Sequence, residues 1–282
     1  MEGALVKRRD FIKAMGIGCV SCCFNPLDAL AKVNRSSGGP AGFLPGCSTR
    51  MGDARISPVR AGSLDGQTYD TEELLQQYDA NAQSRRELYL PVFGEAEVDS
   101  VLAEMRASYQ ALIPDIPYIG EKNFHLQWEI PNAEKLAEYL VAVKYGLTVQ
   151  QFSKLYLDQA EKDLYALPEQ SRRRIGKMQF SPLTQINMMM VAFRSQLRLY
   201  PEDYLLTYIG GDGKEFDWGF DYTQCSADLL FKKYEATDLL IHLICQMDFI
   251  AGEALYAGYY RTMIIPEGAP MCDLRWKWEG AL

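Results

Sequence analysis

Histidine is scarce in this chain of 282 residues, which contains only two. Metal sites and proton relays built from several histidines are therefore nearly excluded. Basic residues are also in deficit, because 29 Lys and Arg stand against 37 Asp and Glu and leave a net charge of −8. Phosphate neutralisation needs clustered cations, so we expect no nucleic acid among the partners.

Long apolar runs and common catalytic signatures are missing as well. The apolar stretch at residues 14–24 is too short to cross a bilayer, so we expect no stable membrane insertion. No Gly-x-Ser-x-Gly elbow, HExxH zinc motif or phosphate-binding glycine loop occurs. The chain is nevertheless 48% hydrophobic, which is enough for a substantial core and excludes a disordered tail protein.

The first 31 residues contain the parts of an export signal. The order Arg-Arg-x-Phe-Ile-Lys from Arg8 to Lys13 is similar to a twin-arginine signal, and a small-x-small cleavage site ends at Ala31. We expect the twin-arginine machinery to export the chain, cleavage after Ala31, and a periplasmic location. The alternatives are an ordinary amphipathic helix and lipid attachment at a signal cysteine.

The remaining chain divides by composition. Residues 32–67 are rich in Gly, Pro and Ser and predict a flexible linker, because such a run buries too little apolar surface to offset its ordering entropy. A folded domain is expected over 68–282, with a helical part at 68–200 and an α+β part at 201–282.

Apolar residues at helical spacing dominate the first part of this domain. Helices are predicted over 70–84, 95–112 and 132–146, from a capping box of Thr148 and Gln151 to before Pro168, and from Ser181-Pro182 onward. On the last of these helices Leu183, Ile186, Met190, Phe193 and Leu197 share one side. The run Met188-Met189-Met190 is interpreted as core filling.

The pattern changes after Pro201. Strands are predicted at 204–209 and 215–223, joined by a Gly-Gly-Asp-Gly turn, then helices at 226–234 and 237–256, and strands at 259–265 and 272–278. No βαβ alternation occurs. The predicted fold class is α+β, a helical N-terminal layer packed on a small antiparallel sheet with two helices in the C-terminal half.

Three cysteines of the folded region, Cys225, Cys245 and Cys272, lie in its last part. Cys225 is placed at a strand–helix junction, where a helix N-terminus lowers the pKa of a thiol. Asp248 shares a face of the second apolar helix with Cys245, and a carboxylate there needs a partner or a function. Asp273 and Arg275 follow Cys272 and point to the opposite face of its strand.

Several interpretations of these residues stay open. The thiols could be inert core residues, or two of them could form a disulfide in an oxidising compartment. Cys225, Cys245 and Cys272, with Asp248, are candidates for a thiolate-rich zinc site, although no CxxC spacing occurs. The sequence requires no cofactor.

Ordered motifs surround these cysteines. They are Phe220-Asp221-Tyr222-Thr223-Gln224-Cys225, Cys245-Gln246-Met247-Asp248, Arg261-Thr262, Gly268 and Cys272-Asp273-Leu274-Arg275, with Ile116-Pro117-Tyr118-Ile119-Gly120 and Asn123 nearer the N-terminus. The series resembles the L-2-amino-thiazoline-4-carboxylic acid hydrolase family over residues 95–278. It departs from the family pattern at Leu274, where Phe is more common.

The resemblance implies a hydrolase that acts on a small molecule and opens the ring of a cyclic amidine to give N-carbamoyl-L-cysteine. Cys225 is then the expected thiolate, attacking the ring carbon or ligating a metal that activates water, and Asp248 the acid–base group. Arg275 or Arg261 would hold the substrate carboxylate. The further candidates are Cys245, Cys272 and Asp273 for catalysis and Asn123 for substrate binding. The alternative is a periplasmic module that binds a small molecule or a metal through the same thiols without catalysis.

Overall fold

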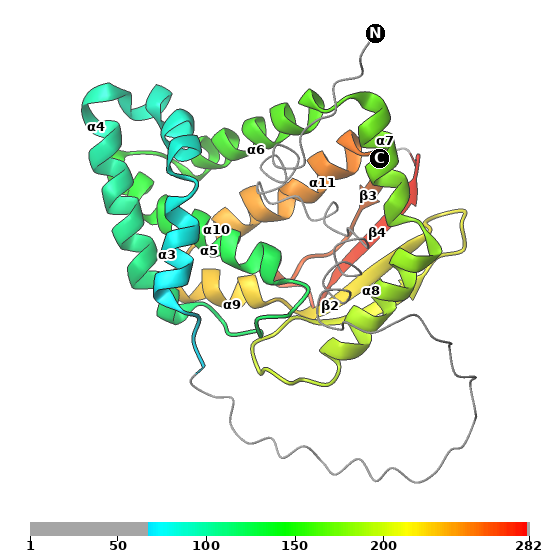
Figure 1. The fold of residues 1–282 in the computed structure, drawn as a ribbon. Coiled ribbons are helices and arrows are strands. Elements are labelled where there is room, and N and C mark those ends of the chain that lie inside the picture. The colour runs from blue at the N-terminus through cyan, green and yellow to red at the C-terminus, as the bar shows by residue number, and fades with distance from the viewer. Residues whose placement is uncertain (1–66, 281–282) are drawn as a thin grey trace, which may run out of the picture.

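The computed structural model describes residues 67–280, and its architecture is α+β, as the sequence predicts (Figure 1). Helices occupy the first part, and four strands with three further helices follow. The helices of the first part are α3 (Thr71–Asp79), α4 (Ala82–Leu112), α5 (Leu126–Ala142), α6 (Val149–Ala166), α7 (Glu169–Gln179) and α8 (Pro182–Ser195), with single turns η1 (Ile113–Asp115) and η2 (Val143–Tyr145). The later elements are β1 (Leu205–Gly210), β2 (Trp218–Gln224), α9 (Ser226–Lys233), α10 (Thr237–Leu239), the π-helical turn η3 (Leu240–Ile244), α11 (Cys245–Ala254), β3 (Ala257–Tyr260), η4 (Ile265–Glu267) and β4 (Cys272–Trp278). The predicted signal at 1–31 and the linker at 32–67 lie outside the described residues, apart from residue 67.

The four strands form one antiparallel sheet in the order β1-β2-β4-β3. The predicted hairpin is confirmed, and Trp218 and Phe220 of β2 are buried as the alternation requires. Tyr222 pairs with Cys272 across β2 and β4, so the two side chains lie side by side on one face of the sheet. The next pair, Asp221 with Asp273, points to the other face.

Local signals fix several helix ends. Thr148 and Gln151 form the predicted capping box of α6, and the Asp70 carboxylate accepts the backbone N–H of Glu73 at the start of α3. The predicted helix at 95–112 begins after a kink at Gly94, whose φ of 71° suits glycine. Its apolar stripe is buried as predicted.

Several element boundaries differ from the prediction, and two of them lie near the candidate site. Helix α5 begins at Leu126 and runs through Pro131, whereas the sequence suggested a start at Asn132. The helix begins early because Trp128, Glu129 and Ile130 are all buried in its first turns. Their burial outweighs the loss of the one helical hydrogen bond that Pro131, which has no N–H, cannot donate. Strand β3 ends at Tyr260 instead of continuing to Ile265, because the side chain of Asp273 binds the backbone of the following loop.

The apolar side of helix α8 faces away from the core, whereas the sequence analysis expected core filling there. Leu183, Ile186, Met190 and Phe193 share one side as predicted, but each is more than 40% exposed, and Leu197, also exposed, lies two residues beyond the end of the helix. Met188 and Ala192, on the other side, pack into the core beside the sheet. The core-filling interpretation is therefore right for Met188 and wrong for Met189 and Met190.

No helix in the segment from 67 to 280 is long and apolar enough to cross a membrane.

Candidate active site

Cys225 is the last residue before α9 and directly follows β2, at the predicted strand–helix junction. Burial raises the pKa of its thiol well above the usual value, and the backbone N–H of Asp228 acts in the other direction. The helix N-terminus does act to lower this pKa, as predicted, but the net shift is upward because desolvation of the thiolate exceeds the stabilisation by the helix end. Cys225 is a neutral thiol in the resting protein.

Cys245 and Asp248 lie on one face of α11, as predicted, immediately after the π-helical turn η3. A π turn inside a helix re-aims the residues that follow it and is frequent at functional sites. Burial raises the pKa of Cys245 to about 12 and that of Asp248 to about 6, and the positive charge of Arg261 opposes both shifts. The Oδ1 atom of Asp248 is buried and has no hydrogen-bond partner among residues 67–280.

Arg261 follows β3 and is held by aromatic rings. Its guanidinium carbon lies 5.0 Å from the ring centre of Phe249 and 5.9 Å from that of Tyr259, and Nη1 donates to the Tyr259 hydroxyl at 3.4 Å. It forms no salt bridge with a carboxylate of the described chain, although Asp248 and Cys245 both experience its charge. Most of its donors thus remain available to an anion.

Cys272 completes the thiol group at the start of β4. Its sulfur accepts the backbone N–H of Ile265 at 3.1 Å, and burial raises its pKa. Charges on Cys245 and Cys272 would each raise the pKa of Cys225, and charges on Asp248, Cys225 and Cys272 would raise that of Tyr222. The fold therefore brings Cys245 and Cys272 near Cys225, and Cys225, Cys272 and Asp248 near Tyr222, which the order of the motifs alone could not show.

His125 and Glu129, at the start of α5, form a polar wall beside the thiols, and the sequence analysis assigned neither of them a function. His125 Nε2 lies 3.1 Å from the Tyr222 hydroxyl, and its ring stacks on Tyr204 at 4.3 Å. Glu129 accepts hydrogen bonds from the hydroxyls of Tyr204 at 2.7 Å and Ser226 at 2.9 Å. Burial lowers the pKa of His125 to about 3 and raises that of Glu129 to about 7, so the histidine is neutral.

One signal in the sequence could have found this wall. His125 and Glu129 are four residues apart and share a face once α5 is known to begin at Leu126. Pro131 obscured that start, because it suggested an irregular link before Asn132. Ser226 follows Cys225 directly, so its bond to Glu129 ties the wall to the thiol.

Asn123 and Asp273 hold loops of the site in place. Asn123 donates to the carbonyl of Ile119 at 2.8 Å and to Asp203 Oδ2 at 2.7 Å, while its Oδ1 accepts the backbone N–H of His125. Asp273 accepts the backbone N–H groups of Thr262 and Met263, both at 2.7 Å, and the Thr262 hydroxyl at 2.6 Å. Burial acts to raise the pKa of Asp273, but these bonds lower it overall. The side chain of Asn123 thus positions His125, and the side chain of Asp273 positions the loop that follows Arg261.

Arg275 lies on the other face of the sheet, away from the thiols. It forms a salt bridge of 2.7 Å with Asp221 and donates to the carbonyls of Phe220 and Leu274, both at 3.0 Å. Three of its five N–H donors are used in these bonds. Of the two arginines considered for the substrate carboxylate, only Arg261 is placed beside Asp248.

The zinc hypothesis does not fit this arrangement. Within residues 67–280 no group of three or more His, Cys, Asp or Glu side chains is arranged to hold a metal ion, and the three cysteines are free thiols. No step of the chemistry below is routed through a metal.

The raised pKa values of the three thiols predict that they react slowly. Treating the folded protein with iodoacetamide at pH 7.5 should leave Cys225, Cys245 and Cys272 largely unmodified, because the thiolate is the reactive form. Peptide mass spectrometry in the presence and absence of urea measures this. Rapid alkylation of Cys225 in the folded protein would show an activated thiolate and contradict the result expected here.

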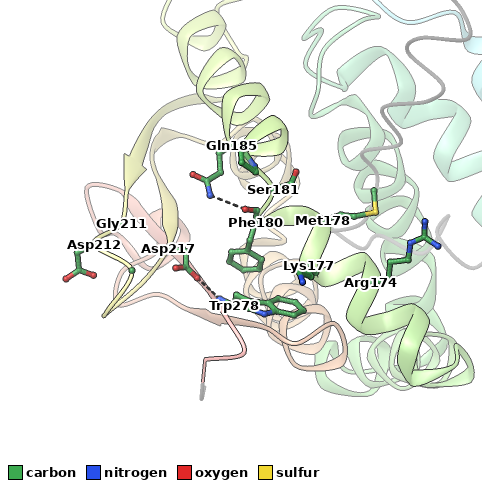
Figure 2. A pocket seen from close by; sticks show the side chains of 12 residues that line it. Arg174, Lys177, Met178, Phe180, Ser181, Gln185, Gly211, Asp212, Asp217 and Trp278 are labelled. Atoms are coloured by element: carbon green, nitrogen blue, oxygen red, sulfur yellow. Dashed lines mark hydrogen bonds between the residues drawn. The ribbon is translucent and has the colours of Figure 1, made fainter.

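A separate cleft of about 810 Å³ lies between the α7–α8 junction and the turn after β1 (Figure 2). Trp278 and Phe180 pack together in its wall, with ring centres 5.7 Å apart. Asp217 accepts the backbone N–H of Trp278 at 2.7 Å, and Gln185 donates to the Phe180 carbonyl at 3.3 Å. None of the thiols, Asp248 or Arg261 lines this cleft.

Comparison with known proteins yields no relative: no family model, no curated protein and no solved structure matches the chain significantly.

Proposed function

We propose that this protein is an exported hydrolase of the L-2-amino-thiazoline-4-carboxylate hydrolase type, which opens a cyclic amidine ring to an N-carbamoyl cysteine-like product. The observation that carries the proposal is the buried Oδ1 of Asp248, which has no hydrogen-bond partner within the described chain and lies near enough to Arg261 for that charge to lower the pKa of Asp248. A buried acid–base group beside an available cation suits a small substrate that carries a carboxylate. The motifs that resemble the family supply the same residues.

The chemistry assigns Asp248 to proton transfer. As a carboxylate it removes a proton from water while the water oxygen bonds to the ring carbon between nitrogen and sulfur. The carbon–sulfur bond then breaks, its electron pair leaves with sulfur, and Asp248 returns the proton to the sulfur. The ring nitrogen takes up the electron pair of the C=N bond when water adds, and it receives the second water proton from the new hydroxyl as the carbonyl forms. It ends as the N–H of a urea, so one water is consumed.

The raised thiol pKa values shape the role of Cys225. A resting thiolate is disfavoured by burial, so direct attack of water is the simpler route. In this route Cys225 contacts the substrate and excludes water, and Cys225→Ala lowers the rate less than Asp248→Asn does. Covalent catalysis by Cys225 predicts the opposite order.

Arg261 is proposed to bind the substrate carboxylate. Arg261→Gln should raise KM for a carboxylate substrate by roughly 10–100-fold with a smaller effect on kcat, because a charge-assisted hydrogen bond contributes about 1.5–3 kcal/mol. Arg275→Gln removes the same group from the opposite face and is the matched control, with KM expected to stay within about twofold. Equal effects of the two substitutions would contradict this assignment.

A substrate panel tests the proposal itself. Ring opening of 2-amino-thiazoline-4-carboxylate releases a new thiol, which a colorimetric thiol reagent detects. We expect turnover of the carboxylate substrate and a large loss for the same ring without its carboxylate. Binding of the substrate without thiol release would instead favour the non-catalytic binding module.

Export is the second part of the proposal, and it depends on the sequence of residues 1–31. Replacing Arg8 and Arg9 by Lys should retain the protein in the cytoplasm of cells that carry the twin-arginine machinery. Fractionation with antibody detection measures this. Unchanged appearance of the double variant in the periplasm would overturn the export route while leaving the proposed chemistry intact.

A further inference from the structure

Tyr222 stands among the thiols and Asp248, and the chemistry proposed above assigns no function to its hydroxyl. Across the sheet its side chain lies beside that of Cys272. Burial raises the pKa of Tyr222 well above its usual value, and negative charge on Asp248 or Cys225 would raise it further. Tyr222 therefore keeps its proton at neutral pH and is a neutral hydrogen-bonding group in the neighbourhood of the acid–base residue.

His125 fixes the direction of this hydroxyl. Its Nε2 atom lies 3.1 Å from the Tyr222 oxygen, and the two rings meet edge to face with their centres 5.8 Å apart. Stacking on Tyr204 and a hydrogen bond from its backbone N–H to Asn123 hold His125 in turn. Burial lowers the pKa of His125 to about 3, so the imidazole does not take the phenol proton. When Nε2–H donates to the Tyr222 oxygen, the phenol O–H and a lone pair remain for a substrate.

Two other tyrosines near the site have hydroxyls that are bound to ionisable side chains. Tyr204 donates to the Glu129 carboxyl at 2.7 Å, and Tyr259 accepts a hydrogen bond from Arg261 at 3.4 Å. The partner of Tyr222, in contrast, is a neutral imidazole. Of these three hydroxyls, that of Tyr222 can give and take a proton without disturbing a charged partner.

The proposed reaction contains a proton transfer that needs such a hydroxyl. After water adds, the new hydroxyl and the ring nitrogen are bonded to the same carbon, and a direct transfer between them passes through a strained four-membered ring. A second hydroxyl that bridges the two atoms turns this into a six-membered ring with nearly normal bond angles. Groups that move protons from a fixed position in this way accelerate reactions by about 10²–10⁴-fold.

We infer that the Tyr222 hydroxyl is this bridge, which makes Tyr222 a further catalytic residue and His125 its positioning residue; the inference rests on the proposed hydrolysis. As the C=N electron pair moves to the ring nitrogen, the phenol O–H bond breaks and its proton bonds to that nitrogen. The phenol oxygen takes the proton of the new hydroxyl, and the electron pair of that O–H bond forms the carbonyl. Tyr222 ends as it began, and no further reactant is consumed.

Tyr222→Phe tests the inference, because it removes only the hydroxyl. We expect kcat for 2-amino-thiazoline-4-carboxylate to fall by roughly 10²–10³-fold, with KM changed by less than about tenfold. Tyr208→Phe makes the same change on β1 of the same sheet, where the hydroxyl binds Gln185 of α8 at 3.2 Å, and should keep the wild-type rate. His125→Phe keeps an aromatic ring but loses Nε2. It should lower kcat by about tenfold, and by less in the Tyr222→Phe background, because the two residues act as a unit.

Binding of the aromatic analogue 2-amino-thiazole-4-carboxylate separates this inference from the hydrolase itself. The analogue offers the same ring nitrogen, but its aromaticity resists the addition of water, so calorimetry measures binding alone. Tyr222→Phe should raise its Kd by roughly 3–10-fold, and Tyr208→Phe should leave it unchanged. Circular dichroism verifies the fold of each variant.

The outcomes are distinguishable. Thiol release by the wild type at a rate that Tyr222→Phe leaves unchanged, or that Tyr208→Phe lowers equally, overturns the role of Tyr222 and leaves the hydrolase intact. A wild type that releases no thiol, but binds the analogue through the Tyr222 hydroxyl, overturns the hydrolysis and its proton transfer while the contact stands.

Discussion

Asp248→Asn should lower the ring-opening rate by about 10²–10⁴-fold while the protein keeps its fold, because it removes the proposed proton-transfer group. The substitution preserves the size of the side chain and replaces the buried Oδ1 region with a neutral amide. Steady-state kinetics on the thiazoline carboxylate measure the effect.

The pH profile separates this role from a structural one. Asp248 must be a carboxylate to accept a proton from water, and burial raises its pKa to about 6. In the wild type kcat/KM should therefore rise with pH through about 6, and the residual rate of Asp248→Asn should lack that limb. Asp221→Asn makes the same change on the opposite face of the sheet, within the salt bridge to Arg275, and should retain both the rate and the limb. An acid limb that persists in Asp248→Asn would assign it to another group.

Arg85→Met should lower the free energy of unfolding by about 3–5 kcal/mol, because it leaves buried carboxylates without their counter-ion. Arg85 lies on α4 and binds Glu134 and Glu138 of α5, each at 2.6 Å, with only 9% of its side chain exposed. Its guanidinium also lies 3.4 Å from the ring centre of Tyr78. The two salt bridges of Arg85 join α4 to α5, the helix that begins after His125 and contains Glu129.

Arg106→Met is the matched control on the same helix. Arg106 binds Asp79 at 2.7 Å, but 42% of its side chain is exposed, so its loss should cost less than about 1 kcal/mol. Urea unfolding of both variants measures the difference. Replacing Glu138 by Leu in the Arg85→Met background should recover part of the loss, because it removes one uncompensated charge. Equal costs for Arg85→Met and Arg106→Met would contradict the assignment of a buried network.

The sequence predicted the elements that depend on local chemistry. The capping box of Thr148 and Gln151 and the alternation through Trp218 and Phe220 each specify their element within a few residues, and both are confirmed. The motif order of Cys225, Cys245 and Cys272 contains no distance between the thiols, so their proximity is a result of the fold.

Features that depend on distant packing could not be predicted. The apolar spacing on α8 is the same whether Phe193 points to the core or away from it, and only the burial of Met188 and Ala192 decides. The pKa of Cys225 depends on desolvation by the whole surrounding core, which outweighs the helix end that the sequence displays. Glu129 gains its role from Tyr204 and Ser226, which are 75 and 97 residues away along the chain.

Release of a thiol from 2-amino-thiazoline-4-carboxylate by the purified wild type, measured beside Asp248→Asn and Asp221→Asn, tests the central claim most directly. We expect thiol release by the wild type and by Asp221→Asn, and a rate at least about 100-fold lower for Asp248→Asn. No thiol release by the folded wild type, or equal release by Asp248→Asn, would contradict the proposed hydrolase.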